Sequence, residues 1–142
     1  MAVLNDKKTK VLKATGKVRR LEDLIRQDQP KGSIGIGHTR WATHGPATVE
    51  NAHPHRAGKI ALVHNGIIEN YKELKQQLKS KGQECVSETD SEVLAHLISQ
   101  LYGDSGNLTS SVQDALQQVE GTYGLVVTVS YTHLTLPTTP YV

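Results

Sequence analysis

The spacing of apolar and polar positions predicts short strands and one helix in the first forty residues. Apolar side chains in residues 1–5 and 10–14 flank the polar segment NDKKTK, which indicates two strands joined by a turn. In residues 17–27 the apolar side chains recur at helical spacing, and Pro30 predicts the end of that helix. Small and apolar residues alternate in residues 32–40, as is typical of a strand.

The remaining pattern predicts a strand, then helices, then a final strand. The segment KIALVHNG, residues 59–66, reads as a strand that ends at a turn. Apolar positions in residues 70–82, 87–103 and 108–119 have helical spacing. Residues 122–130, TYGLVVTVS, are rich in β-branched side chains and predict a strand. This order of elements indicates an α+β fold built from packed layers.

Two short patterns predict where helices begin. Thr89 and Glu92 have the spacing of a capping box, in which two side chains satisfy the first backbone N–H groups of a helix. Ser110 and Gln113 repeat this spacing within the third segment, residues 108–119.

Composition and charge exclude several classes of protein. A formal net charge of +2 is too small to indicate a nucleic-acid partner, and no apolar run approaches the ~18 residues of a membrane span. The amino terminus lacks the apolar region of a signal peptide. The single cysteine, Cys85, excludes an internal disulfide and fits a reducing compartment, so we expect a cytoplasmic protein in which Cys85 is a small core residue.

The candidate chemistry is concentrated between residues 38 and 64, which hold five of the seven histidines together with two arginines and the only tryptophan. A metal site, a substrate pocket or ordinary loop chemistry would each explain this composition. The segments HPH and HTRWATH lack the usual zinc-ligand spacings, so we expect no metal.

Four motifs decide among these explanations: GHTRWATHG, NAHPH, VHNGIIENY and SETDSEV. In this order and spacing they resemble the glutaminase domain of the glutamine–fructose-6-phosphate aminotransferases (isomerizing), which are class II glutamine amidotransferases. The resemblance covers residues 1–130. It implies the N-terminal-nucleophile hydrolase fold, a four-layer α-β-β-α sandwich of antiparallel sheets.

The resemblance also implies a reaction. In this family an amino-terminal cysteine attacks the carboxamide of L-glutamine, forms a thioester and releases ammonia. The ammonia passes to separate sugar isomerase domains, where fructose 6-phosphate becomes glucosamine 6-phosphate. We therefore expect L-glutamine as ligand, no cofactor, no nucleic-acid or membrane partner, and a parent enzyme that is a homo-oligomer.

The sequence departs from the family pattern at both ends. It has no cysteine at its start, and the family's first strand and helix are missing, so we expect a partial glutaminase domain that is inactive by itself. Residues 131–142 resemble an adapter-derived tail and are set apart from the domain. Two alternatives stay open, namely a glutamine-binding module without catalytic activity and a histidine-rich metal-binding protein.

The resemblance assigns both charges of glutamine to residues of this chain. Arg40 matches the arginine that binds the α-carboxylate, and a guanidinium fork suits a carboxylate. Asp90 matches the aspartate that binds the α-ammonium group. The alternatives are an arginine at a strand end and a helix cap formed by Thr89 and Asp90.

The other matched residues concern the reacting carboxamide and the pocket wall. Asn65 and Gly66 match the oxyanion hole, in which two N–H donors face developing negative charge; the alternative is an Asn-Gly hairpin turn. Trp41 matches the tryptophan that gates the ammonia channel, although it could instead fill a core. The remaining expectations are that Thr43, His44 and His53 line the glutamine site and that His38, His55 and His64 hydrogen-bond the scaffold.

Overall fold

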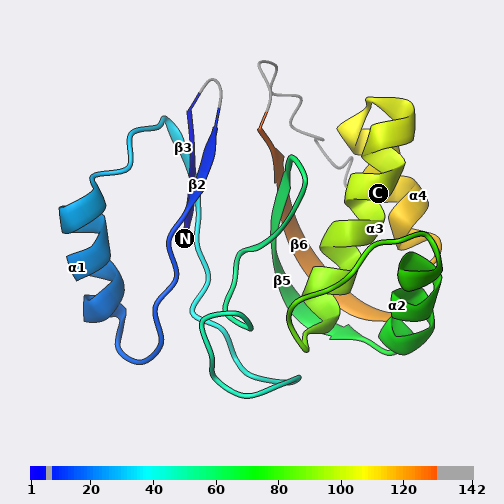
Figure 1. Cartoon of the computed structure of the whole chain (residues 1–142), viewed down its shortest axis with the longest axis horizontal. Helices are drawn as coiled ribbons and strands as arrows, with labels where there is room; N and C mark the ends of the chain where they lie inside the picture. Colours follow the sequence, from blue (N-terminus) through cyan, green and yellow to red (C-terminus); the bar gives the residue numbers. More distant parts are fainter. Residues whose placement is uncertain (6–7, 131–142) are drawn as a thin grey trace, which may run out of the picture.

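The computed structural model describes residues 1–5 and 8–130, which form two sheets stacked between helical layers (Figure 1). The first sheet has the order β2-β1-β3 and comprises β1 (Ala2–Leu4), β2 (Thr9–Val11) and β3 (Ile34–Ile36). The second has the order β4-β5-β6 and comprises β4 (His55–Ala57), β5 (Ile60–Ile68) and β6 (Gly121–Val129). Every strand pairing in both sheets is antiparallel.

The helices are divided unequally between the outer faces of the two sheets. Helix α1 (Val18–Asp28) lies beside the first sheet, whereas α2 (Tyr71–Ser80), α3 (Asp90–Ser105) and α4 (Leu108–Leu116) lie beside the second (Figure 1). The predicted α+β architecture, a four-layer α-β-β-α sandwich of antiparallel sheets, is confirmed. No helix in the described ranges has both the length and the apolar composition needed to cross a bilayer.

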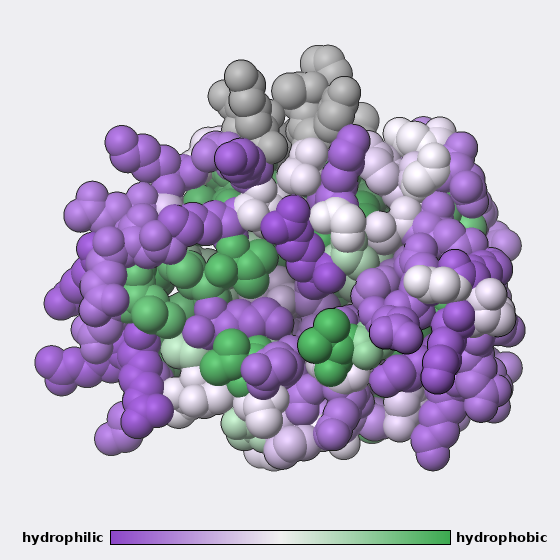
Figure 2. Space-filling view, in the orientation of Figure 1, coloured by the Kyte–Doolittle hydropathy of each residue, from purple (hydrophilic) through white to green (hydrophobic). Residues whose placement is uncertain are grey.

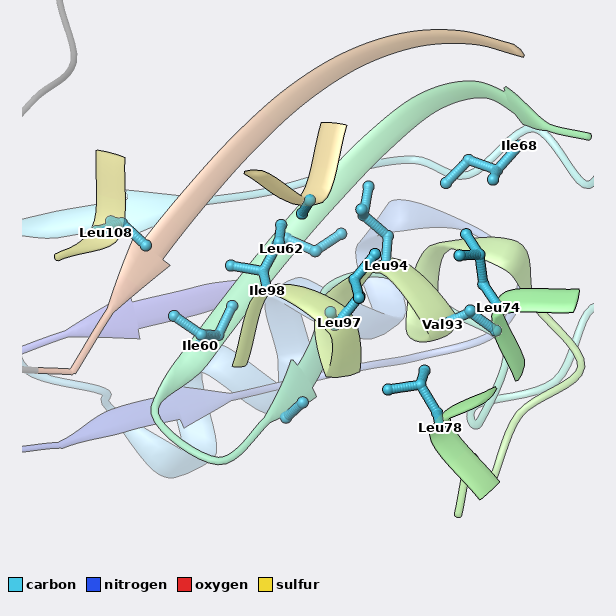
Figure 3. Close-up of a cluster of buried hydrophobic side chains, with 13 residues drawn as sticks. Ile60, Leu62, Ile68, Leu74, Leu78, Val93, Leu94, Leu97, Ile98 and Leu108 are labelled. Atoms are coloured by element: carbon cyan, nitrogen blue, oxygen red, sulfur yellow. The ribbon is translucent and has the colours of Figure 1, made fainter. Parts of the chain in front are cut away.

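The main core lies between the second sheet and its three helices (Figure 3). Strand β5 contributes Ile60, Leu62 and Ile68 to this core, while the alternate residues Ala61 and Val63 face a smaller apolar cluster shared with the first sheet. Because successive side chains of a strand point to opposite faces, β5 is buried on both sides over its first half. The helices supply the other large side chains of the main core: Leu74, Leu78, Val93, Leu94, Leu97, Ile98 and Leu108.

The prediction that the strand of residues 59–66 ends at a turn is wrong. Strand β5 continues through the Asn-Gly pair to Ile68, and Asn65 and Gly66 pair with Gly124 and Tyr123 of β6. The hairpin interpretation of Asn-Gly is therefore also wrong. A long partner strand supplied from residues 121–129 extends β5, which no local pattern around residue 65 could indicate.

The predicted helix caps are only partly correct. Thr89 caps α3 and its hydroxyl accepts a hydrogen bond from the Glu92 N–H at 3.3 Å. The Glu92 carboxylate, however, accepts from two N–H groups of the preceding loop instead of the Thr89 N–H, so only half of the capping box forms. Helix α4 begins one turn earlier than its Ser110 pattern predicts, because Asn107 is the cap and accepts from the Ser110 N–H at 3.1 Å.

Strand β4 was not predicted from the sequence, because three residues are too few to show alternation. Cys85 is only half-buried and packs against the edge of the main core, where burial raises the pKa of its thiol. The adapter-like tail, residues 131–142, lies outside the described residues.

Candidate functional site

A cavity of about 290 Å³ lies where the end of β5, the start of α3 and the loop after β3 converge. All eight residues predicted for the site line it: Arg40, Trp41, Thr43, His44, His53, Asn65, Gly66 and Asp90. These residues are up to fifty positions apart in the sequence, so the fold brings together what the motifs had suggested separately. A larger cavity of about 470 Å³ adjoins this one and shares His38, Arg40 and His53 with it, and extends past Leu12 to Val18 and Leu21 of α1.

Asp90 supplies a fixed negative charge to the cavity. Its side chain is buried, at 3% exposure, and it is the first residue of α3. One carboxylate oxygen accepts a hydrogen bond from the Ile68 N–H at 2.9 Å, and the other accepts from the Ser91 N–H at 2.9 Å. Among the described residues the only basic side chain within 4 Å of its carboxylate is His44, whose Nδ1 lies 3.8 Å away. A buried carboxylate without a lysine or arginine partner is suited to bind a cation from outside the chain.

Arg40, in the loop after β3, supplies a positive charge to the cavity. Its guanidinium donates to the backbone carbonyls of His44, Gly45 and Pro46, and so closes the loop of residues 40–46. A guanidinium has five N–H donors; these three bonds use Nη1 once and Nη2 twice, and leave the Nε–H and one Nη1–H for other acceptors. No acidic side chain in the described part of the chain forms an ion pair with Arg40. The group can therefore hold the loop and still bind an anion.

Asn65 and Gly66 present donor groups from the open end of β5. The ladder between β5 and β6 continues to Glu69, whose N–H donates to the Glu120 carbonyl at 2.8 Å. Because hydrogen-bonded and non-bonded pairs alternate along an antiparallel ladder, the Gly66 N–H points away from β6. The N–H groups of His64 and Ile68, on the same edge of β5, donate to His53 and Asp90 of the cavity. The Gly66 N–H lies between them and faces the same space.

The close approach of two backbones requires glycine at position 66. Gly66 has a φ of 133°, a conformation that side chains disfavour. A Cβ atom at this position would lie 2.0 Å from the Thr122 carbonyl oxygen of β6. The glycine of the motif is therefore a requirement of the sheet as well as of the cavity wall.

Buried histidines form the floor of the site. His53 stacks on His38, with ring centroids 4.3 Å apart, and meets His55 edge to face at 4.9 Å. Burial, assisted by the positive charge of neighbouring groups, lowers the pKa of His53 to about 2 and that of His55 to about 4. Burial likewise lowers the pKa of His64, against the opposing effect of Asp90. These rings are neutral near pH 7.

His55 and His64 form hydrogen bonds to the scaffold. His55 Nε2 and the Thr89 hydroxyl lie 3.0 Å apart, and His64 Nδ1 and the Ser91 hydroxyl lie 2.9 Å apart. Both partners belong to the start of α3, so the histidines connect the second sheet to the helix that carries Asp90.

The loop side of the cavity is more open. His44 is edge-on to Tyr71, with ring centroids 4.9 Å apart, and its Nδ1 lies 3.3 Å from the Thr43 hydroxyl. Trp41 is 86% exposed, so the interpretation of this indole as core filler is wrong. An exposed indole at the rim of a cavity is available to a ligand or to another part of a larger enzyme.

Sequence reasoning missed one residue that organises the loop. Asn51 donates to the Pro46 carbonyl at 3.1 Å and accepts from the Glu88 N–H at 3.0 Å, so it joins the Arg40 loop to the segment before α3. Gly45 makes room for it, because a Cβ there would lie 2.6 Å from the Asn51 amide nitrogen. The only signal was that Asn51 opens the motif NAHPH.

The donor set does not suit a metal ion. Within residues 1–5 and 8–130, no group of three or more histidine, cysteine, aspartate or glutamate side chains is arranged to hold one. The cavity instead combines one cationic group, one anionic group and backbone donors.

Comparison with known proteins identifies the family. Residues 38–136 match the family model described as the glutamine amidotransferase domain. The chain belongs to the glutamine amidotransferase family. The matched segment contains every residue of the site described above.

Three relatives of this glutamine amidotransferase domain carry the name glutamine–fructose-6-phosphate aminotransferase [isomerizing]. The protein of that name from Idiomarina loihiensis is 50% identical over 123 residues, which cover 86% of this chain and 20% of the relative. One from Thermus thermophilus is 48% identical over 129 residues, or 89% and 21% of the two chains. The one from Methanosarcina mazei is 52% identical over 126 residues, or 81% and 20%. The chain thus spans about a fifth of the length of the curated relatives it matches.

Solved structures confirm the fold of the glutamine amidotransferase domain. The glutamine phosphoribosylpyrophosphate amidotransferase from B. subtilis, complexed with ADP and GMP, matches with a TM-score of 0.74 and 30% identity. That match covers 91% of this chain and 28% of the solved one. A structure described as the allosteric regulatory enzyme of purine biosynthesis matches with a TM-score of 0.71, also at 30% identity and with the same coverage. The predicted N-terminal-nucleophile hydrolase fold is confirmed by these likenesses.

Proposed function

We propose that this chain is the glutamine-binding part of a glutamine–fructose-6-phosphate aminotransferase, and that it binds L-glutamine in the 290 Å³ cavity. The observation that carries this proposal is the pair of opposite charges on the cavity wall. Arg40 keeps its positive charge and has an Nε–H and an Nη1–H donor left, and buried Asp90 has no lysine or arginine partner in the described residues. A free α-amino acid carries both complementary charges on one carbon atom.

The charges also predict selectivity. A peptide-bound or N-acylated glutamine lacks the ammonium group and would leave the Asp90 carboxylate buried without a cation. A buried charge left without its partner is strongly unfavourable, so such ligands should be rejected. Glutamate has the same α-carbon groups as glutamine but adds a second negative charge at the far end of the cavity.

The carboxamide end of glutamine would meet the donors of β5. Asn65 and the Gly66 N–H line the same cavity, and such donors stabilise an oxyanion formed when a thiol attacks the amide carbon. In the proposed reaction the carbon–sulfur bond forms, the thiol proton passes to the amide nitrogen, and the carbon–nitrogen bond breaks to release ammonia. Water then hydrolyses the thioester to glutamate.

The thiol comes, by the family resemblance, from a cysteine at the amino terminus of the mature enzyme. The one cysteine of the printed sequence, Cys85, does not line the cavity. We propose that these 142 residues alone bind glutamine and do not hydrolyse it. In the whole enzyme, the released ammonia would pass exposed Trp41 and reach the sugar isomerase domains, which form glucosamine 6-phosphate. We propose that this enzyme is a cytoplasmic homo-oligomer and that the glutamine site uses no cofactor.

Calorimetric titration of the 142-residue chain tests the binding proposal. We expect L-glutamine to bind and N-acetyl-L-glutamine to show no detectable heat. Equal binding of the two ligands would contradict the assigned role of Asp90. If L-glutamine does not bind, a glutamine site in this cavity is excluded, and the alternative of a glutamine-binding module is excluded with it.

A further inference from the structure

His38 hydrogen-bonds to two residues of the site through its two ring nitrogens. Nδ1 lies 2.9 Å from the backbone N–H nitrogen of Arg40, and Nε2 lies 2.6 Å from the side-chain oxygen of Asn65. Asn65 is 27 positions away in the sequence. One imidazole therefore connects the loop that carries the cationic group to the strand that carries the amide donor.

The bond to Arg40 determines which nitrogen of His38 carries the proton. A backbone N–H can only donate, so Nδ1 must be the unprotonated acceptor. In the neutral ring the proton is then on Nε2, which donates it to Asn65. A doubly protonated ring could not accept from the Arg40 N–H, and the opposite tautomer would lose both bonds.

The tautomer in turn determines which end of the Asn65 amide faces the cavity. With its oxygen held by the Nε2–H group of His38, the amide directs its NH₂ group elsewhere, and Asn65 lines the cavity. If the amide were reversed, oxygen lone pairs would face the carbonyl oxygen of a bound carboxamide. Such a site would repel an oxyanion, so the choice between the two orientations matters for turnover.

The ring that makes this choice is itself fixed. His38 stacks on buried His53 with an interplanar angle of 23°. His53 Nδ1 accepts the N–H of His64 in β5 at 3.3 Å, which holds the lower ring of the stack against the same strand as Asn65. The stack limits rotation of His38 about its own axis, as a positioning group requires.

We infer that His38 is a positioning residue, which holds the Asn65 amide with its NH₂ group toward the reacting carboxamide. This inference rests on the proposed function and assigns His38 a role beyond the scaffold contact expected from sequence. The competing explanation is that His38 matters only for the shape of the Arg40 loop.

Two substitutions separate these explanations, because each keeps one of the two bonds. In His38→Gln the side-chain amide reaches the position of Nε2 and can still donate to Asn65. In His38→Asn the amide reaches only the position of Nδ1 and can still accept from the Arg40 N–H. Positioning of Asn65 predicts that the Gln variant keeps turnover and the Asn variant loses it, whereas a loop-shaping role predicts the reverse.

Steady-state glutaminase kinetics in the full-length enzyme that contains this chain supply the first readout. We expect His38→Asn to lower kcat by on the order of 10-fold or more, and His38→Gln to stay within about 3-fold of wild type. In an Asn65→Ala background, His38→Asn should change kcat by less than about 2-fold, because its effect passes through Asn65. Additive effects, or loss of turnover in the Gln variant alone, would overturn the inference.

Nitrogen NMR of the 142-residue chain supplies a second readout that does not depend on activity. Long-range proton–nitrogen spectra should show His38 with Nε2 protonated and Nδ1 unprotonated, and the Asn65 amide signals should move in His38→Asn but not in His38→Gln. A protonated Nδ1 would overturn the inference. If the full-length enzyme releases no ammonia, the proposed function fails, and the NMR spectra still decide whether His38 sets the Asn65 amide.

Discussion

At the scale of single residues, Asp90 joins two elements of the site. Its carboxylate accepts the N–H of Ile68 at the end of β5 and the N–H of Ser91 in the first turn of α3, so the strand and the helix are both attached to one buried charge. The start of a helix and two N–H donors together favour a negative charge at this position. The charge is held rigidly, and a bound ammonium group would neutralise it.

The substitution Asp90→Asn tests that charge. The amide keeps the size of the side chain but removes the negative charge, and a charge-assisted hydrogen bond is worth about 1.5–3 kcal/mol. We expect L-glutamine to bind about 10–100-fold more weakly, as measured by calorimetry. Asp104→Asn, on an exposed residue at the other end of α3, is the matched control and should leave binding unchanged. Equal weakening in both variants would indicate a non-specific charge effect.

The buried histidines predict how stability depends on pH. The pKa of His55 falls from 6.5 to about 4 on folding, and that of His53 to about 2, in both cases mainly through burial. The unfolded chain therefore takes up protons below about pH 6.5 that the folded chain does not, and stability falls as pH decreases from 6.5 toward 4. Glu92 has a pKa of about 2 against an ordinary 4.5, because hydrogen bonds outweigh burial, so its contribution is lost below about pH 4.5.

Urea unfolding between about pH 7.5 and 4 measures this dependence. The variant His55→Gln can still donate a hydrogen bond to Thr89 but does not titrate, so we expect a smaller loss of stability between pH 6.5 and 4. A wild-type protein whose stability is constant down to about pH 4 would show that the buried rings do not resist protonation.

The residues of the site could be predicted from sequence only to the extent that motifs name them. Each of the eight predicted residues lines the cavity, because the motifs specify residue types at fixed spacing. The connections among residues could not be predicted. The bond from His38 to Asn65 and the bridge made by Asn51 span 27 and 37 positions, and depend on how strands and loops meet in space.

At the scale of elements, the pairing of β5 with β6 depends on glycine at one position and not at another. Gly66→Ala would place a Cβ 2.0 Å from a backbone oxygen at a φ of 133°, so neither partner can move away easily. We expect a loss of about 2–4 kcal/mol in the free energy of unfolding. In Gly124→Ala, on the facing strand, the nearest atom to the new Cβ is the Asn65 carbonyl oxygen at 3.9 Å, so this variant should be neutral or stabilise by about 0.5 kcal/mol. Thermal unfolding of the pair is the measurement, and similar losses in both would contradict this account.

Helices and strands were predicted correctly where the apolar repeat is long. The prediction failed where a strand forms only by pairing with a strand that is distant in the sequence. Helices α2, α3 and α4 were predicted because apolar side chains recur over two or more turns on the face that meets the core. Strand β4 and the extension of β5 beyond Asn65 were missed, because each exists through a partner strand. The predicted cap of α4 at Ser110 was wrong because Asn107, one turn earlier, accepts from the Ser110 N–H, so that Ser110 is already inside the helix.

At the scale of the whole molecule, binding and hydrolysis should be separable. A polypeptide of the 142 printed residues has one cysteine, and Cys85 does not line the cavity. We expect it to bind L-glutamine without releasing ammonia, because nucleophilic catalysis needs a thiol at the amide carbon. A coupled ammonia assay on the purified chain checks this. Ammonia release that Cys85→Ala abolishes would show that the site has been assigned to the wrong nucleophile.

The two outer layers should differ in stability as well as in position. Helix α3 buries five apolar side chains in the main core, whereas α1 has no buried residue. On the face shown in Figure 2, apolar side chains gather around a hollow between α1 and the first sheet, and Leu12, Val18 and Leu21 line the cavity of about 470 Å³. The ion pair of Lys10 with Asp28 is nearly half exposed and contributes little.

Hydrogen exchange followed by mass spectrometry measures this difference. An isolated helix of 11 residues is marginal in water, so α1 depends on packing that the hollow reduces. We expect α1 amides to exchange through local opening with little dependence on denaturant, and α3 amides to exchange only through global unfolding. Protection of α1 equal to that of α3, with the same denaturant dependence, would show that the first helix belongs to the same cooperative unit as the core. The packing that is lost at the cavity would then cost too little free energy to let α1 open before the rest of the domain.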